Sequence, residues 1–157
     1  MDKKQKKFLL VILLWLFLLG CSAPFWFMRS LPTSPVSVKL EPRLIEVRAD
    51  QAWHNTGIVL QPGDLLVIRY VSGLWSPWPG GMYDAIGFGG DPKCDCNVLK
   101  GVSHAALIGK LNDGLPFFVG DNFRQRVGES GVLYLGINDL RISDNSGALL
   151  VQVEVWR

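Results

Sequence analysis

The chain has 157 residues, enough for one domain with its core but with little room for a second domain. Its formal net charge of +2 depends on four lysines within residues 3–7, since residues 21–157 carry 12 basic and 13 acidic residues. A nearly neutral domain has no electrostatic footprint for phosphate backbones, so we expect no nucleic-acid partner.

The N-terminus has the pattern of an export signal. The lysine cluster precedes an apolar run over residues 8–19, which leads into Gly20-Cys21. The sequence Leu18-Leu19-Gly20-Cys21 resembles a bacterial lipobox, in which Cys21 receives the lipid. A transmembrane anchor is the alternative, because residues 8–28 carry no charge and are long enough to cross a bilayer. We therefore expect residues 1–21 to be a lipoprotein signal peptide or a transmembrane anchor. Both tether the domain to a membrane of the bacterial cell envelope, in the periplasm or outside the cell.

Residues 22–42 contain four prolines and several serines, which indicates a linker between the membrane and the domain. From residue 43 onward the sequence shows short apolar segments separated by turn residues, without a convincing helical period. The expected strands lie at residues 43–48, 57–60, 65–71, 104–111, 116–120, 131–137 and 148–156. This series predicts an all-β domain over residues 43–157, folded as an antiparallel β-sandwich.

Residues 72–103 interrupt the series and are too long for an ordinary sandwich turn, and loops of that length are usually functional or partly disordered. They contain Trp75 and Trp78 among glycines and prolines. One interpretation is a platform on which a sugar ring stacks. The other is that the two tryptophans bury apolar area at the open end of the sandwich.

Cys94 and Cys96 form a C-x-C sequence in the same loop. If Cys21 is lipidated, these two remain as an even pair in an oxidising compartment, which makes a disulfide between them possible. Two unpaired thiols and a metal or redox role are the alternatives, although a second cysteine pair for a zinc site is missing.

The sequence carries no recognisable catalytic motif. It has no G-x-S-x-G, no H-E-x-x-H and no phosphate-cradling glycine loop. The two histidines are His54 and His104, and His104 opens an apolar strand, where a structural role is the common one. We therefore expect a protein that is not an enzyme.

The stretch NDLRISDNSG, residues 138–147, lies between two apolar strands. Asp139, Ser143, Asp144 and Asn145 offer the hard oxygen ligands that calcium prefers. The same residue types are also common in plain turns, so the spacing leaves a calcium loop and an ordinary hairpin turn both open.

Over residues 49–155 the sequence resembles the bacterial PA-I galactophilic lectin family, including its lectin-like domains. The segments that carry the resemblance combine turn glycines with the apolar strands and the polar stretch above. They are Trp53, 56–58, 60–64, 72–75, 106–111, 116–120, 133–139 and 144–147.

The resemblance implies a galactose-binding-domain-like, lectin-like jelly roll that holds a calcium ion, which takes two sugar hydroxyls into its coordination shell. It implies that Asp139 contacts both calcium and sugar, that Asp144 and Asn145 match the family's asparagine pair, and that Ser143 replaces its threonine. A backbone carbonyl near Pro77 or Trp78 would complete the site. The family's sugar-selecting His and Gln have no counterpart, because residues 94–97 occupy their loop.

The expected function is therefore calcium-dependent carbohydrate binding by a membrane-tethered domain. Asp139 and Asp144 would contact the sugar, and Trp75 or Trp78 would form an apolar wall. The alternative is a structural or protein-interaction module of the same fold, and the glycan and the oligomeric state stay open.

Overall fold

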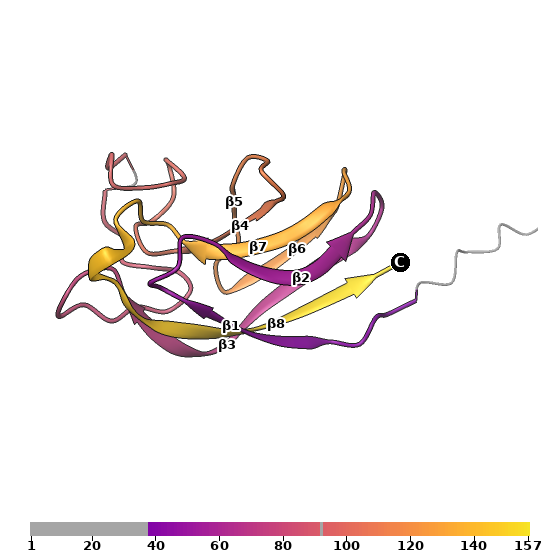
Figure 1. The fold of residues 1–157 in the computed structure, drawn as a ribbon, viewed down its shortest axis with the longest axis horizontal. Helices are drawn as coiled ribbons and strands as arrows, with labels where there is room; N and C mark the ends of the chain where they lie inside the picture. The colour runs from indigo at the N-terminus through magenta and orange to yellow at the C-terminus, as the bar shows by residue number, and fades with distance from the viewer. Residues whose placement is uncertain (1–37, 92) are drawn as a thin grey trace, which may run out of the picture. The chain divides into compact units, whose positions relative to one another are not determined.

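The computed structural model describes residues 38–91 and 93–157, which form two antiparallel sheets (Figure 1). In the first sheet β1 (Arg43–Arg48) pairs with β8 (Ser146–Trp156), followed by β3 (Leu65–Ser76) and β6 (Asn122–Arg126). In the second, β2 (His54–Leu60) pairs with β7 (Gly131–Ile137), followed by β4 (Leu107–Leu111) and β5 (Phe117–Phe118). The predicted signal or anchor, Cys21 and most of the predicted linker lie outside the described residues.

The core lies between the two sheets and follows from the alternation of apolar residues along the strands. In β8 the buried residues are Leu149, Val151, Val153 and Val155, and in β7 they include Leu133, Leu135 and Ile137. Side chains from β1, β2, β3 and β4 complete the same apolar cluster. The predicted all-β, antiparallel sandwich is therefore confirmed.

Several strands differ from the sequence prediction: β2 begins at His54, β5 is limited to Phe117–Phe118 and β8 begins at Ser146. β3 continues past residue 71 to Ser76, because its second half pairs with β8 after an irregularity between Tyr70 and Ser72. β4 begins at Leu107 rather than at residue 104. β6 was not predicted, since its polar sequence NFRQR lies at a sheet edge with most side chains exposed.

The chain enters the sandwich alongside the end of β8. The N–H of Val38 donates to the carbonyl of Arg157, and the N–H of Leu40 donates to that of Val155. The ammonium group of Lys39 lies 3.1 Å from a carboxylate oxygen of Glu154, a buried residue. The last residues of the predicted linker, 38–42, thus include a short segment paired with the sheet.

Two connections meet at the end of the sandwich opposite the C-terminus (Figure 1). One is the long loop between β3 and β4, and the other joins β7 to β8 through a short 3-10 turn, η2 (Ile142–Asp144). Within the part of the chain that the structure describes, no helix has the length and apolarity needed to cross a membrane.

Candidate binding site at the loop end of the sandwich

A cavity of about 310 Å³ opens where the two connections meet. The long β3–β4 loop contributes Pro77, Trp78, Cys96 and His104, and the β7–β8 connection contributes Asp139, Arg141 and Asp144. Segments far apart in the sequence thus converge on one cavity, which brings together Asp139, Asp144 and Trp78 of the sequence prediction.

Asn138, the residue before Asp139, fixes the long loop against β7. Its side-chain oxygen accepts the N–H of Leu99 at 2.7 Å, and its amide nitrogen lies 3.0–3.3 Å from the carbonyls of Leu99, Val102 and Ser103. Its own carbonyl accepts the N–H of Ala105. Asn138 is completely buried, so one side chain sets the position of the loop that carries His104.

Asp139 points the other way and is 5% exposed. One carboxylate oxygen, Oδ1, accepts the backbone N–H of Arg141 at 2.9 Å. The other, Oδ2, lies 3.9 Å from Nε2 of His104, too far for a hydrogen bond. Asp139 therefore has one oxygen held by the backbone and one directed towards the histidine.

His104 is buried, and its orientation is set by two neighbours. Nδ1 lies 2.8 Å from Oδ1 of Asn97, and the imidazole stacks on the Trp78 indole with 5.5 Å between ring centroids. Because Oδ1 of Asn97 is an acceptor, this hydrogen bond places a proton on Nδ1. Nε2 is the ring nitrogen that faces the Asp139 carboxylate in the cavity.

Asp144 is already paired with a cation. Its two carboxylate oxygens accept hydrogen bonds from Nε and Nη2 of Arg141, at 3.2 and 2.6 Å. The hydrogen bond from Arg141 holds the pKa of Asp144 below its usual value, and the same bond raises the pKa of Arg141. This carboxylate is therefore charged and satisfied in the absence of metal.

Asn145 is buried, and its amide nitrogen donates to the carbonyl of Ala49 at 3.2 Å. Its side-chain oxygen is buried and finds no hydrogen-bond partner among the described residues. Ser143 is exposed on η2, and neither Ser143 nor Asn145 is among the residues that line the cavity. Of the four predicted metal ligands, Asn145 has an oxygen in need of a partner and Ser143 faces solvent.

The donor set fits calcium better than a transition metal. Nowhere in residues 38–91 or 93–157 do three His, Cys, Asp or Glu side chains gather as a metal site. The cavity lining offers the two carboxylates of Asp139 and Asp144, which with backbone carbonyls and water are ligands that calcium accepts. The unpartnered oxygen of Asn145 is the observation that favours such an ion, because a buried acceptor without a partner is costly.

Trp75 is not part of the cavity, and its predicted role as a wall for a sugar is wrong. Its side chain is completely buried in the core, where Nε1 donates to the carbonyl of Ala105 at 2.8 Å. Trp78 is partly exposed, lines the cavity and packs edge-on against Phe88, itself 48% exposed. One tryptophan therefore buries apolar area and the other faces the site.

The structure joins Cys94 and Cys96 by a disulfide bond, as the sequence prediction allowed. The carbonyl of Cys96 accepts the N–H of Leu140 at 2.8 Å, and its sulfur lies 3.5 Å from Nδ1 of His104. The C-x-C segment of the long loop thus contacts both His104 and the β7–β8 connection.

Sequence reasoning missed His104 and Asn138 as site residues. His104 was interpreted as a structural residue at the start of a strand, and Asn138 as part of a turn. The apolar strand that ends just before Asn138 could have pointed to this residue, because loops that follow strands often carry site residues.

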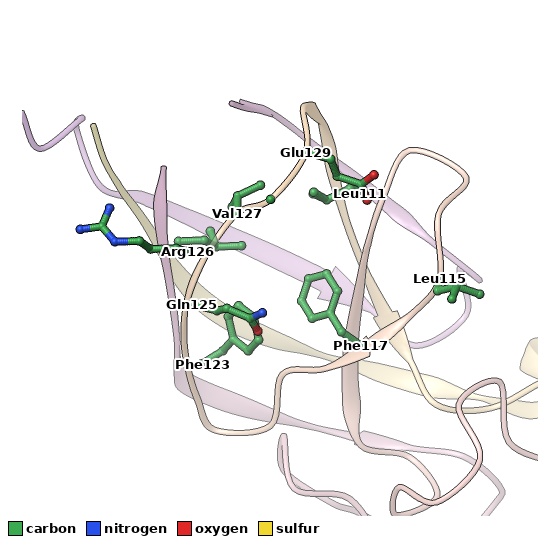
Figure 2. A pocket seen from close by; sticks show the side chains of 10 residues that line it. Leu111, Leu115, Phe117, Phe123, Gln125, Arg126, Val127 and Glu129 are labelled. Carbon is green, nitrogen blue, oxygen red and sulfur yellow. The ribbon is translucent and has the colours of Figure 1, made fainter. Parts of the chain in front are cut away.

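A larger cavity of about 410 Å³ lies elsewhere, between β6 and the β4–β5 edge of the other sheet (Figure 2). Phe117 and Phe123 stack there with 4.9 Å between ring centroids, and Leu115 is 91% exposed. Its walls are mostly apolar, and its charged members, Arg126 and Glu129, are exposed. This groove lacks the convergent buried polar groups that distinguish the cavity at the loop end.

The β-sandwich shares its fold with a solved lectin domain. Among solved structures the chain is similar to the N-terminal domain of EclA, described as a PllA-like lectin, with a TM-score of 0.56 and 23% identity. The match covers 71% of this chain and 94% of that one. No protein-family model matches the sequence, and no curated protein does. The likeness establishes a shared fold, which confirms the lectin-like fold that the sequence resemblance implied.

Proposed function

We propose that the chain is a membrane-tethered, extracytoplasmic lectin-like protein that binds carbohydrate with the help of a calcium ion. The observation that carries the proposal is the cavity in which Asp139 and Asp144 meet Trp78 and His104 within a lectin fold. Binding rather than catalysis is the proposed activity, since these groups offer coordination, stacking and hydrogen bonds.

Asp139, Asp144 and Asn145 would hold the ion, and a backbone carbonyl of the long loop would add to them. Pro77 is the better source of that carbonyl, because the carbonyl of Trp78 accepts hydrogen bonds from the Ser76 hydroxyl and the Gly81 N–H. When bound, calcium supplies open coordination positions for sugar hydroxyls. Ser143 is a weaker candidate, since its side chain is exposed outside the cavity.

Two side chains of the cavity, His104 and Trp78, would contact the sugar directly. Nε2 of His104 can form a hydrogen bond with a sugar hydroxyl whose oxygen lies near the Asp139 carboxylate. The partly exposed Trp78 offers an apolar ring face or edge for the C–H groups of a sugar. Affinity per site would be modest, because each sugar hydroxyl exchanges hydrogen bonds to water for hydrogen bonds to protein.

The test of calcium binding is thermal unfolding of the full-length chain in detergent, with calcium and with chelator. An ion that binds only the folded state adds about 2.7 kcal/mol at 100 times its Kd, which raises Tm by about 10 °C in a domain of this size. Asp139→Asn should abolish the increase, while Asp113→Asn, on an exposed turn, should keep it. An unchanged Tm in the wild-type protein would refute the calcium site.

A glycan array in calcium and in chelator then tests the sugar. Calcium-dependent signals that disappear in Asp139→Asn are expected. A silent array would favour the alternative, a structural or protein-interaction module.

The tether is tested separately by labelling cells with radioactive palmitate. We expect the label on the wild-type protein and its loss in Cys21→Ala. An unlabelled wild-type protein that stays in the membrane uncleaved would instead identify residues 8–28 as a transmembrane anchor.

A further inference from the structure

We propose that Arg141 is a built-in competitor of calcium: its guanidinium neutralises Asp144 in the metal-free protein and has to leave that carboxylate when the ion binds. This inference rests on the proposed calcium site and concerns its regulation. It predicts that a calcium-dependent ligand binds only above a threshold calcium concentration, which the Arg141–Asp144 pair helps to set.

The first step is the geometry of the pair. The guanidinium contacts both carboxylate oxygens of Asp144 through Nε and Nη2, the two-pronged arrangement in which arginine binds carboxylates most strongly. Both residues line the same cavity as Asp139. An ion that takes an oxygen of Asp144 as ligand therefore meets a positive charge already seated on that group, and like charges repel.

The second step is that Arg141 can leave. Its side chain is 79% exposed, so the released guanidinium reaches solvent without disturbing the core. Its backbone N–H holds Oδ1 of Asp139, and that bond does not depend on the side chain. The loop can thus keep Asp139 in place while the side chain of Arg141 changes partner.

The third step is the balance of charge. Without metal, the cavity lining contains two carboxylates and one guanidinium. With calcium bound and the guanidinium withdrawn, two carboxylates face a divalent cation. The arginine therefore lowers the calcium affinity without removing a ligand.

The experiment measures calcium Kd by isothermal titration calorimetry on the full-length chain in detergent, for wild type, Arg141→Gln and Arg141→Lys. We expect Arg141→Gln to bind calcium on the order of 10-fold more tightly, from the combined loss of the ion pair and of the repulsion. Arg141→Lys should lie between the two, because lysine keeps the charge but not the two-pronged contact. Arg48→Gln is the matched control, since Arg48 forms the same kind of exposed pair with Asp50 and does not line the cavity.

A second measurement follows the arginine itself. In ¹⁵N NMR spectra the Nε–H signal that disappears in Arg141→Gln should exchange with water more slowly in chelator than in calcium. An Nε–H exchange rate that is unchanged at saturating calcium would overturn the proposal, because the guanidinium would then not have moved.

The outcomes separate this inference from the proposed function. A wild-type protein that binds calcium, with Arg141→Gln equal or weaker, would overturn the competition and leave the calcium site intact. Calcium binding by Arg141→Gln alone would support the competition in its strongest form. If neither protein binds calcium, both the site and the competition are refuted.

Discussion

At the scale of single residues, Asn138 and Asp139 divide two tasks between neighbouring positions. Successive side chains of an extended chain point in opposite directions, so one enters the protein and the other faces the cavity. Asn138 holds the long loop through its amide group, and Asp139 presents a carboxylate beside His104. The fold at this position and the proposed binding chemistry thus depend on adjacent side chains.

Asn138→Ala should destabilise the protein by roughly 2–4 kcal/mol, because it leaves several partly buried backbone groups of the loop without partners. The affected groups are the N–H of Leu99 and the carbonyls of Leu99 and Ser103. Urea unfolding of the full-length chain measures the change. Asn122→Ala, an exposed residue of β6, should cost much less, and a similar cost for both variants would contradict the assignment.

The sequence predicted Asp139 and Asp144 because a cluster of calcium-type oxygens in a short segment is visible without a structure. His104 and Cys96 were not predictable as neighbours of that segment, since their approach depends on the path of the long loop. Trp75 was misassigned because it is the same residue type as Trp78 and lies close to it in the sequence. Only burial distinguishes a core tryptophan from one at a cavity.

At the scale of elements, the close pairing of β3 with β8 fixes the positions from which both site loops extend. Two glycines with positive φ lie on this seam, Gly73 at +94° and Gly147 at +81°. A Cβ on Gly147 would come within 2.5 Å of the carbonyl oxygen of Leu74, so a larger residue there would push the strands apart. Gly147, the last residue of the NDLRISDNSG stretch, therefore permits the close pairing of β3 with β8.

The strands whose sequences alternate were predicted well, and those without alternation were not. β7 matches its predicted range, and β8 begins two residues earlier than expected. The second half of β3 contains Ser72 and Gly73 and resembles a loop, but pairing with β8 outweighs local propensity. β6 has one partly buried apolar residue, Phe123, which is too little for a period-two signal.

At the scale of the whole molecule, Glu154 couples acid stability to the segment at residues 38–40. The hydrogen bond from Lys39 is the main cause that holds the pKa of Glu154 below its usual value, with help from Arg69 and Gln152 against the cost of burial. A carboxyl whose pKa is lowered by folding stabilises the native state above its unfolded pKa, about 4.3. That contribution is lost as the pH falls through the lower, folded pKa.

Lys39→Gln should therefore reduce stability at neutral pH and move the acid-unfolding midpoint to higher pH. The reason is that Glu154 then takes up its proton more readily. Circular dichroism recorded from pH 7 to pH 2 gives the midpoint. Lys100→Gln breaks an exposed pair with Asp95 and should leave it unchanged, whereas equal shifts would rule out the buried pair as the cause.

Because residues 38–40 pair with the end of β8, the chain enters the domain at the end opposite the candidate site. β8 starts at Ser146, just after the candidate site, and ends at Trp156, which pairs with Lys39. The 11 residues of this strand separate the two ends by roughly 35 Å. A fluorescent protein or biotin acceptor peptide fused after Arg157 would therefore leave the cavity unobstructed. Sensor surfaces coated through that fusion should display every copy with its cavity directed at the solution.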